Sequence, residues 1–280
     1  MKVAACDLTV ALISEIFSSE RELVGCLERA RNQRATLAIL PELPFNLWSP
    51  ATRAASAEDA EGPGGWRENM LCAAAKTAGI AVLGGVIRRD SSGFRTNLAL
   101  LSDSHGCVIG SSAKHVLPDE EGFWECDHYR PSKDLPRVIE FKGAKLGVQI
   151  CSDANRPTAA QLLAAQGVQV ILAPRATSPA SWERWRLAYQ AMALTCSAWV
   201  VSVGRPRPEF GVDIGGPSLV VDPMGEVVLE TTDRIAVTTL DLRAVEDARL
   251  SYPGYLAWAA KMYAAGWAEV HKNHIQQTVT

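Results

Sequence analysis

The chain has 280 residues, of which 48% are hydrophobic and 21% charged, the composition of an ordinary globular protein. Its formal net charge of −3 gives no reason to expect nucleic acid or an anionic membrane as a partner. The N-terminus lacks the apolar core of a signal peptide, and no stretch approaches the ~18 consecutive apolar residues of a membrane helix. Seven scattered cysteines without a CxxC pair argue against a disulfide framework or a zinc cluster and for a reducing compartment. We therefore predict a cytoplasmic protein.

Short β-rich runs alternate with helical patterns along the whole chain. The runs that predict strands are residues 2–8, 36–43, 80–87, 95–102, 106–112, 137–143, 145–151, 168–174, 198–204, 217–230 (a hairpin turning at 222–225) and 235–242. The patterns that predict helices cover 18–34, 68–78, 157–167 and roughly 180–196. Neither a linker nor a repeat interrupts the alternation, so we expect residues 1–280 to form one α/β domain.

The segment KLGVQICSDANRPT, residues 145–158, ends an apolar run on Cys151 and continues at once with small, polar, turn-forming residues. A free cysteine is a small hydrophobic side chain and can simply cap a core strand. A cysteine held at a strand end can also act as a nucleophile, which requires thiolate character, a proton acceptor and a stabiliser for the oxyanion. The partners that the rest of the chain supplies decide between the two interpretations.

Histidine is the commonest proton acceptor, yet none of the five histidines is a persuasive partner for Cys151. His115 and His128 are the better placed, although each is more often a polar loop residue. Glu42 is a stronger candidate, because it ends the apolar run LAILPEL, where a carboxylate is costly to bury unless it is paired or used.

Two more charged residues stand in the segment SSAKHVLPDEEGFWECDHYRP. Lys114 follows a strand of small residues, and Glu125 lies between two apolar neighbours. Taken singly, each is more often a surface or ion-pair residue than a catalytic one. Their order along the chain, with Glu42 before them and Cys151 after them, changes that interpretation.

Together these motifs resemble those of the carbon–nitrogen hydrolase (nitrilase) superfamily, over nearly the whole chain. PEL carries the family's glutamate at Glu42, and GVQICSDANRP carries its nucleophile at Cys151. KHVLPDEEGFWECDHYRP resembles the lysine segment, with Lys114 and the second glutamate of many members at Glu125. Three separated motifs in the family's order form a strong signal, whereas any one of them would be weak.

The resemblance implies a role for each residue. Glu42 would be the general base that takes the Cys151 proton and later activates water. Lys114 and the backbone N–H of Ser152 would stabilise the oxyanion, and Glu125 would hold Lys114 and orient substrate or water. The intermediate would be a thioester that water resolves, and neither a metal nor an organic cofactor would be needed.

The resemblance also implies a four-layer α-β-β-α sandwich that pairs through its sheets into a homodimer, often into a larger homo-oligomer. The aromatic-rich segment 252–267 favours association independently, because a monomer would leave these rings partly exposed. We expect residues 251–280 to form a C-terminal tail involved in subunit contacts.

The sequence departs from the family pattern in three places. Thr195 and Cys196 replace an acidic–amide pair, and Thr158 follows Pro157 where Glu is common, which puts subunit packing and helix anchoring in doubt. Arg175, in APRAT, occupies a place that is usually small or polar.

Arg175 bears on substrate choice, because it is expected at the carboxyl end of a strand, where open α/β sheets usually bind ligands. Its guanidinium could bind the carboxylate of an acidic amide or a ureido acid. The alternatives are a structural ion pair and an arginine pointing to solvent. Trp124, next to the second glutamate, is a further candidate substrate contact.

The first functional hypothesis is an amidase-type enzyme that cleaves a linear amide or N-carbamoyl C–N bond of a small molecule. The second is a nitrilase, whose motif normally has a Trp-Glu pair after the cysteine where this chain has Ser152 and Asp153. The third is a catalytically silent scaffold or binding member of the family, against which the four intact positions argue.

Overall fold

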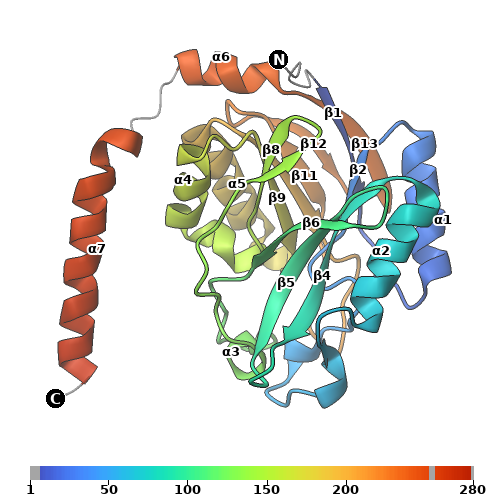
Figure 1. Cartoon of the computed structure of the whole chain (residues 1–280), viewed down its shortest axis with the longest axis horizontal. Coiled ribbons are helices and arrows are strands. Elements are labelled where there is room, and N and C mark those ends of the chain that lie inside the picture. The colour runs from blue at the N-terminus through green and yellow to red at the C-terminus, as the bar shows by residue number, and fades with distance from the viewer. Residues whose placement is uncertain (1–6, 252–255, 279–280) are drawn as a thin grey trace.

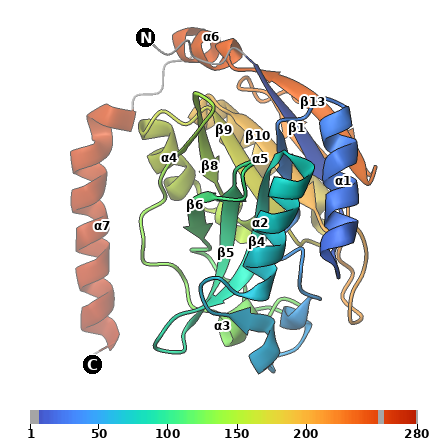
Figure 2. The ribbon, with the colours of Figure 1, turned by 45° about the vertical axis from the view of Figure 1, so that its right-hand side comes forward.

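The computed structural model describes residues 7–251 and 256–278, and within the last helix it describes the side chains of residues 260–272. Two β-sheets lie face to face, and helices cover the outer face of each sheet (Figures 1 and 2). This is the four-layer α-β-β-α sandwich that the resemblance implied.

The first sheet is mixed, with the strand order β13-β1-β2-β4-β5-β6 and with β3 beside β4. Its strands are β1 (Asp7–Ile13), β2 (Leu37–Ile39), β3 (Ala60–Glu61), β4 (Ala81–Arg89), β5 (Arg95–Ser102), β6 (Val108–Ala113) and β13 (Ile235–Asp241). Strands β1, β2 and β4 run parallel to one another, so their carboxyl ends meet at the same edge of the sheet.

The second sheet has the order β12-β11-β10-β9-β8-β7. Its strands are β7 (Ile139–Phe141), β8 (Ala144–Val148), β9 (Val170–Arg175), β10 (Trp199–Gly204), β11 (Ser218–Val221) and β12 (Val227–Thr231). Strands β8, β9 and β10 are parallel, which gives this sheet a shared carboxyl edge as well.

Helices α1 (Glu20–Asn32) and α2 (Trp66–Ala78) pack on the first sheet, and α4 (Pro157–Ala165) and α5 (Trp182–Cys196) pack on the second. The Ser19 hydroxyl caps α1 by accepting from the amide of Glu22, and α2 ends at Gly79, whose φ of 67° favours glycine. The remaining helices are α3 (Glu125–His128), α6 (Arg243–Ser251) and α7 (Leu256–Thr278), with 3-10 turns at Ser49–Ala51, Ala57–Asp59, Cys151–Asn155 and Pro179–Ser181.

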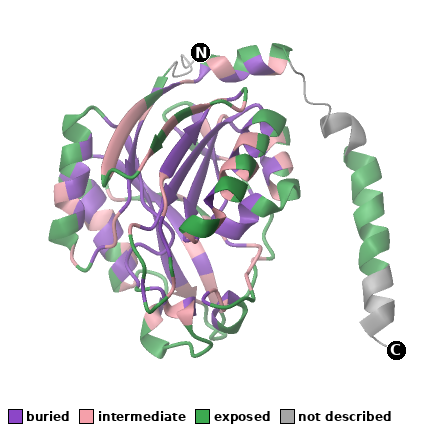
Figure 3. Cartoon of the chain, turned by 180° about the vertical axis from the view of Figure 1, so that it is seen from behind, coloured by how far each residue is buried: buried purple, intermediate pink, exposed green. Residues whose placement is uncertain are grey.

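Alternation along the strands sorts side chains between two apolar layers. In β1, Leu8, Val10 and Leu12 face the second sheet, whereas Ala11 and Ile13 face the helices α1 and α2. The core between the sheets and the cores under the helices are therefore filled by the same strands, and Figure 3 shows their buried residues.

Most predicted strand ends lie within two residues of the observed ones, but three strands end at clearly different residues. The first strand is Asp7–Ile13 and not 2–8, because this stretch pairs with both β13 and β2; residues 2–6 lie outside the described part. Strands β2 and β8 end at Ile39 and Val148, so Glu42 and Cys151 stand in the turns beyond them. The hairpin of β11 and β12 is confirmed, with the Asp222 side chain accepting from the backbone amides of Met224 and Glu226.

Helix α7 stands to one side of the sandwich (Figures 1 and 2). Its side chains from 260 to 272 are all exposed, including those of Met262, Tyr263, Trp267 and Val270 (Figure 3). Part of the predicted association segment, 252–259, lies outside the described side chains. No helix in the described chain combines the length and apolarity needed to cross a membrane.

Candidate active site

Four of the residues predicted from the sequence lie close to one another beside the carboxyl ends of the strands. Glu42 follows β2, Lys114 follows β6 directly, Glu125 begins α3 and Cys151 begins a 3-10 turn after β8. All four side chains are buried, with at most 3% of each residue exposed. The fold therefore buries three charged groups and a thiol together, which is costly unless they neutralise one another.

Lys114 is the centre of this cluster. Its Nζ donates to Glu42 Oε1 at 2.8 Å and to the two carboxylate oxygens of Glu125 at 2.6 and 2.7 Å. Burial opposes the positive charge, but the carboxylates of Glu125 and Glu42 outweigh burial and hold the pKa of Lys114 well above its usual value. Lys114 is thus a permanently charged donor held between two carboxylates.

The pKa of Glu125 is raised to about 8, because burial and the charge of Glu42 disfavour its ionised form more than Lys114 favours it. Near neutral pH the cluster therefore holds more protons than three isolated side chains would. A proton held inside a dry site is available for transfer, which is the property that acid–base chemistry requires.

Glu42 has one oxygen occupied and one oxygen without a partner. Oε1 accepts from Lys114 and, at 2.7 Å, from the side-chain amide of Asn97, whereas the buried Oε2 has no hydrogen-bond partner in the described structure. An unsatisfied buried carboxylate oxygen is unfavourable in a resting protein, and it is a ready proton acceptor. Sequence reasoning missed Asn97, although a buried amide in the apolar strand RTNLALLS was a usable signal.

Cys151 adopts a left-handed backbone conformation with φ of 48°, which is uncommon for a residue with a side chain. Its thiol donates to the carbonyl of Ala176 at 3.3 Å. Burial, followed by the charge of Glu42, raises its pKa well above the usual value against the pull of Lys114. The thiol is therefore protonated at rest and needs a base before it can attack.

Ser152 lies in the first turn of the 3-10 helix that Cys151 begins. The first N–H groups of such a helix have no partner within it, so the amide beside the thiol can serve an oxyanion. The Ser152 hydroxyl is engaged elsewhere, because it donates to the carbonyl of Val116. The side chain thus ties the turn to the segment after Lys114.

Asp153 joins the same two segments and was not predicted. Its Oδ1 accepts from the amides of His115 and Val116 at 2.9 and 2.8 Å, and its Oδ2 accepts from the amide of Ile150 at 3.1 Å. One buried carboxylate therefore fixes Lys114 relative to Cys151. The signal was the acidic residue inside CSDAN, which we assigned only to a turn.

The two histidines considered as bases are directed elsewhere. His115 Nε2 lies 2.8 Å from the carbonyl of Asp134, and the neighbouring carboxylate of Asp153 raises the pKa of the ring despite partial burial. His128 Nε2 lies 2.6 Å from the carbonyl of Thr52. No group of three or more His, Cys, Asp or Glu side chains within the described residues is arranged to hold a metal ion.

Arg175 ends β9 and is fully buried. Its guanidinium donates to the hydroxyl of Thr177 and to the carbonyls of Gly215 and Pro217, and it lies 4.6 Å from the ring centre of Trp182. Neither alternative drawn from the sequence, an ion pair or a solvent-facing side chain, is correct, because no described carboxylate lies within ion-pair distance. Burial lowers its pKa, as expected for a cation without a counter-charge.

Trp124 lies outside this cluster of contacts. It is half-buried, its ring is covered by the guanidinium of Arg53 at 3.6 Å, and its amide donates to the carbonyl of Pro50. The described contacts do not join it to Cys151 or Lys114.

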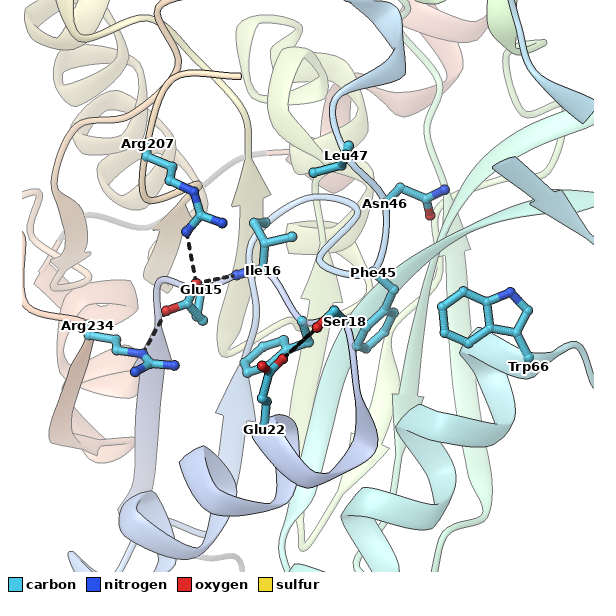
Figure 4. A pocket seen from close by; sticks show the side chains of 11 residues that line it. Glu15, Ile16, Ser18, Glu22, Phe45, Asn46, Leu47, Trp66, Arg207 and Arg234 are labelled. Carbon is cyan, nitrogen blue, oxygen red and sulfur yellow. Dashed lines mark hydrogen bonds and ion pairs between the residues drawn. The ribbon is translucent and has the colours of Figure 1, made fainter. Parts of the chain in front are cut away.

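The cluster is closed to solvent in this conformation. An apolar group that includes Leu43, Tyr129, Ala176 and Ile214 packs beside it, and Tyr129 adds a buried hydroxyl that has no hydrogen-bond partner among the described residues. A separate pocket of about 520 Å³ opens on the far side of the Glu42 loop, where Phe45 and other residues line it (Figure 4).

Comparison with known proteins gives three findings. Residues 5–250 match the carbon–nitrogen hydrolase family. Two curated relatives are the omega-amidase NIT2 of Danio rerio, 29% identical over 81% of this chain and 84% of its own length, and the N-carbamoylputrescine amidase of Arabidopsis thaliana, 26% identical over 64% and 65%. A solved carbon–nitrogen hydrolase from Helicobacter pylori G27 superposes with a TM-score of 0.80 at 18% identity, covering 92% of this chain and 98% of that one.

Proposed function

Because the chain belongs to the carbon–nitrogen hydrolase family and its relatives include amidases, we propose that it cleaves a linear amide or N-carbamoyl C–N bond of a small molecule through a thioester on Cys151. The observation that carries the proposal is the buried Oε2 of Glu42, which has no hydrogen-bond partner in the described structure, whereas Oε1 of the same carboxylate accepts from Lys114. That oxygen is a proton acceptor kept out of water in a site that also contains a protonated thiol.

These positions support the following reaction. Glu42 takes the thiol proton as Cys151 Sγ attacks the carbonyl carbon, and the oxyanion forms against the Lys114 ammonium and the Ser152 amide. Collapse of this intermediate breaks the C–N bond, and the leaving ammonia or amine takes the proton from Glu42. Glu42 then takes a proton from water, whose hydroxide attacks the thioester, and the thiolate departs and recovers the proton. Glu125 holds Lys114 in place throughout.

Two other activities compete with this one. A nitrilase would use the same nucleophile, but Ser152 and Asp153 stand where nitrilases normally carry Trp-Glu, and Asp153 has a structural task here. A silent scaffold would have no use for a buried ion cluster around a thiol, which is costly to maintain.

The test is ammonia release from a panel of linear amides, ureido acids and nitriles, with Cys151→Ala and the exposed Cys107→Ala as matched variants. We expect turnover of amides or ureido acids, its loss in Cys151→Ala, and unchanged turnover in Cys107→Ala. Intact-mass spectrometry with a poor substrate should show one acyl adduct on Cys151. Activity restricted to nitriles, or full activity of Cys151→Ala, would refute the proposal.

We propose further that Arg175 binds a carboxylate of the substrate. A fully buried cation normally has an anionic partner, yet this guanidinium donates hydrogen bonds only to neutral oxygens, and its Nε has no partner in the described structure. Gly204 leaves room for it, since a Cβ there would lie 2.9 Å from Nη2. Arg175→Met should lower kcat/KM for an acidic substrate by about 30-fold or more and barely change it for the neutral analogue. Equal losses on both substrates would assign Arg175 to the fold.

We propose finally that the protein forms a homodimer to which α7 contributes. The exposed Tyr263, Trp267 and Val270 recur at helical spacing, and such a stripe needs a covering surface. A second copy supplies the same stripe and is the simplest occupant.

A further inference from the structure

Behind the loop that carries Glu42 lies a second fully buried guanidinium, that of Arg205, which follows the end of β10. Its Nη1 donates to the carbonyls of Glu42 and Leu43 at 2.8 and 2.9 Å, and its Nη2 donates to the carbonyl of Asn46 at 2.9 Å. Three carbonyls of one short loop therefore converge on one side chain, and the first belongs to the proposed base.

Glu209 completes this arrangement. Its carboxylate accepts from Arg205 Nη2 at 2.6 and 2.7 Å and from Nε at 3.1 Å, and its Oε2 also accepts from the amide of Trp48 at 2.8 Å. The pair thus holds the loop at its beginning, through Glu42, and at its end, through Trp48. Nη1, Nη2 and Nε of Arg205 all donate hydrogen bonds, so the guanidinium has little freedom to rotate.

The loop needs such support because its backbone is unusual. Leu43 has a φ of 48°, a left-handed conformation that a leucine rarely adopts. This conformation directs the carbonyls of Glu42 and Leu43 toward the same nitrogen of Arg205. Gly85 of β4 packs directly beneath, where a Cβ would lie 3.0 Å from the Leu43 amide.

We propose that Arg205, held by Glu209, is a positioning residue that sets the direction of the Glu42 carboxylate and so controls proton transfer from Cys151. The inference rests on the proposed role of Glu42 as base. Arg205 contacts Glu42 through its main-chain carbonyl and acts through the loop. A lysine cannot replace it, because the three N–H donors of one ammonium cannot serve three carbonyls and both oxygens of a carboxylate.

Arg207 offers a matched control. It lies two positions further on, is exposed, and pairs with Glu15 at 3.3 Å at the edge of the pocket that Phe45 and Asn46 line on the other side of the loop (Figure 4). The same Arg-to-Lys change at this position keeps the charge and leaves the carbonyls of the loop untouched.

The first experiment compares Arg205→Lys with Arg207→Lys in steady-state kinetics and in the alkylation of Cys151 by chloroacetamide at neutral pH. If the base Glu42 is displaced in Arg205→Lys, kcat should fall by about 10–100-fold while KM stays within about threefold of the wild-type value. The alkylation rate should fall to a matching extent, and neither change should occur in Arg207→Lys. Glu209→Gln, which preserves shape, should show the same pattern more weakly, and it decides the question if Arg205→Lys does not fold. Normal kinetics in Arg205→Lys, or equal losses in Arg207→Lys, would overturn the inference.

The second experiment places Arg205→Lys in a Glu42→Gln background. If Arg205 acts through Glu42, Cys151 of the double variant is alkylated no more slowly than Cys151 of Glu42→Gln alone. If Arg205 has an independent structural role, the losses in alkylation rate from the two changes are additive, which refutes the positioning role. If Glu42→Gln alone keeps the wild-type alkylation rate and turnover, the proposed base is wrong. The two failures are therefore distinguishable.

Discussion

Replacing Lys114 with Met would keep an unbranched side chain and remove the ammonium group between two buried carboxylates. Wild-type Lys114 donates to Glu42 and to both oxygens of Glu125 at 2.6–2.8 Å, with no exposed side-chain surface on any of the three. Removing one partner of a buried ion pair costs about 3–5 kcal/mol, because the remaining charge is left without compensation.

The loss of stability in Lys114→Met depends on pH. The variant can avoid a buried charge by protonating the carboxylate that stays ionised in the wild type, and this costs about 1.4 kcal/mol per pH unit above the ordinary carboxyl pKa of about 4.3. The penalty is therefore about 4 kcal/mol at pH 7.5 and about 1 kcal/mol at pH 5. Lys114→Met should lose about 3 kcal/mol more stability, relative to wild type, at the higher pH.

Urea unfolding at the two pH values measures this difference, with the exposed Lys133→Met as control. The control should change the free energy of unfolding by less than about 0.5 kcal/mol at either pH. A loss in Lys114→Met that is the same at pH 5 and pH 7.5, or below about 1 kcal/mol at both, would show that the carboxylates are not left as buried charges.

Three further outcomes can be measured. Because the folded pKa of Glu125 is raised to about 8, the native state binds the extra proton, so the free energy of unfolding should fall as pH rises from about 4.5 to 8, by at most about 1.4 kcal/mol per unit. Glu125→Gln should flatten this slope, and an unchanged slope contradicts the assignment. Asp153→Ala should cost about 3 kcal/mol or more in urea unfolding, since three amides lose their acceptor, whereas exposed Asp134→Ala should cost little. Truncation after Ser251 should convert a dimer into a monomer, as measured by light scattering. A truncated protein that is still a dimer would show that α7 is not part of the interface.

The proposed catalytic set could be predicted from the sequence because each member departs from what its local sequence leads one to expect. Glu42 follows an apolar strand, Lys114 follows a strand of small residues, and Cys151 precedes a polar turn. Each is a reactive or charged side chain at a position where an inert, buried residue is expected. Hydrophobic patterns likewise predicted helices α1, α2, α4 and α5 and every strand except β3, because periodicity records which faces are buried, whereas α3, α6 and α7 were not predicted. These patterns involve only residues that are neighbours in the sequence, so they can be recognised without knowledge of the fold.

Only the tertiary structure determined which groups support that set. Asn97 and Arg205 bond to Glu42 across 55 and 163 residues of sequence, and Asp153 bonds to the amide that follows Lys114 across 38 residues. Nothing near any of these residues in the chain indicates its partner. Arg175 shows the same limit, since its lack of a counter-charge appears only when every neighbouring atom is in place. The sequence determines which side chains are buried, whereas the fold determines which of them meet, because hydrogen-bond partners are chosen by the packing of distant segments.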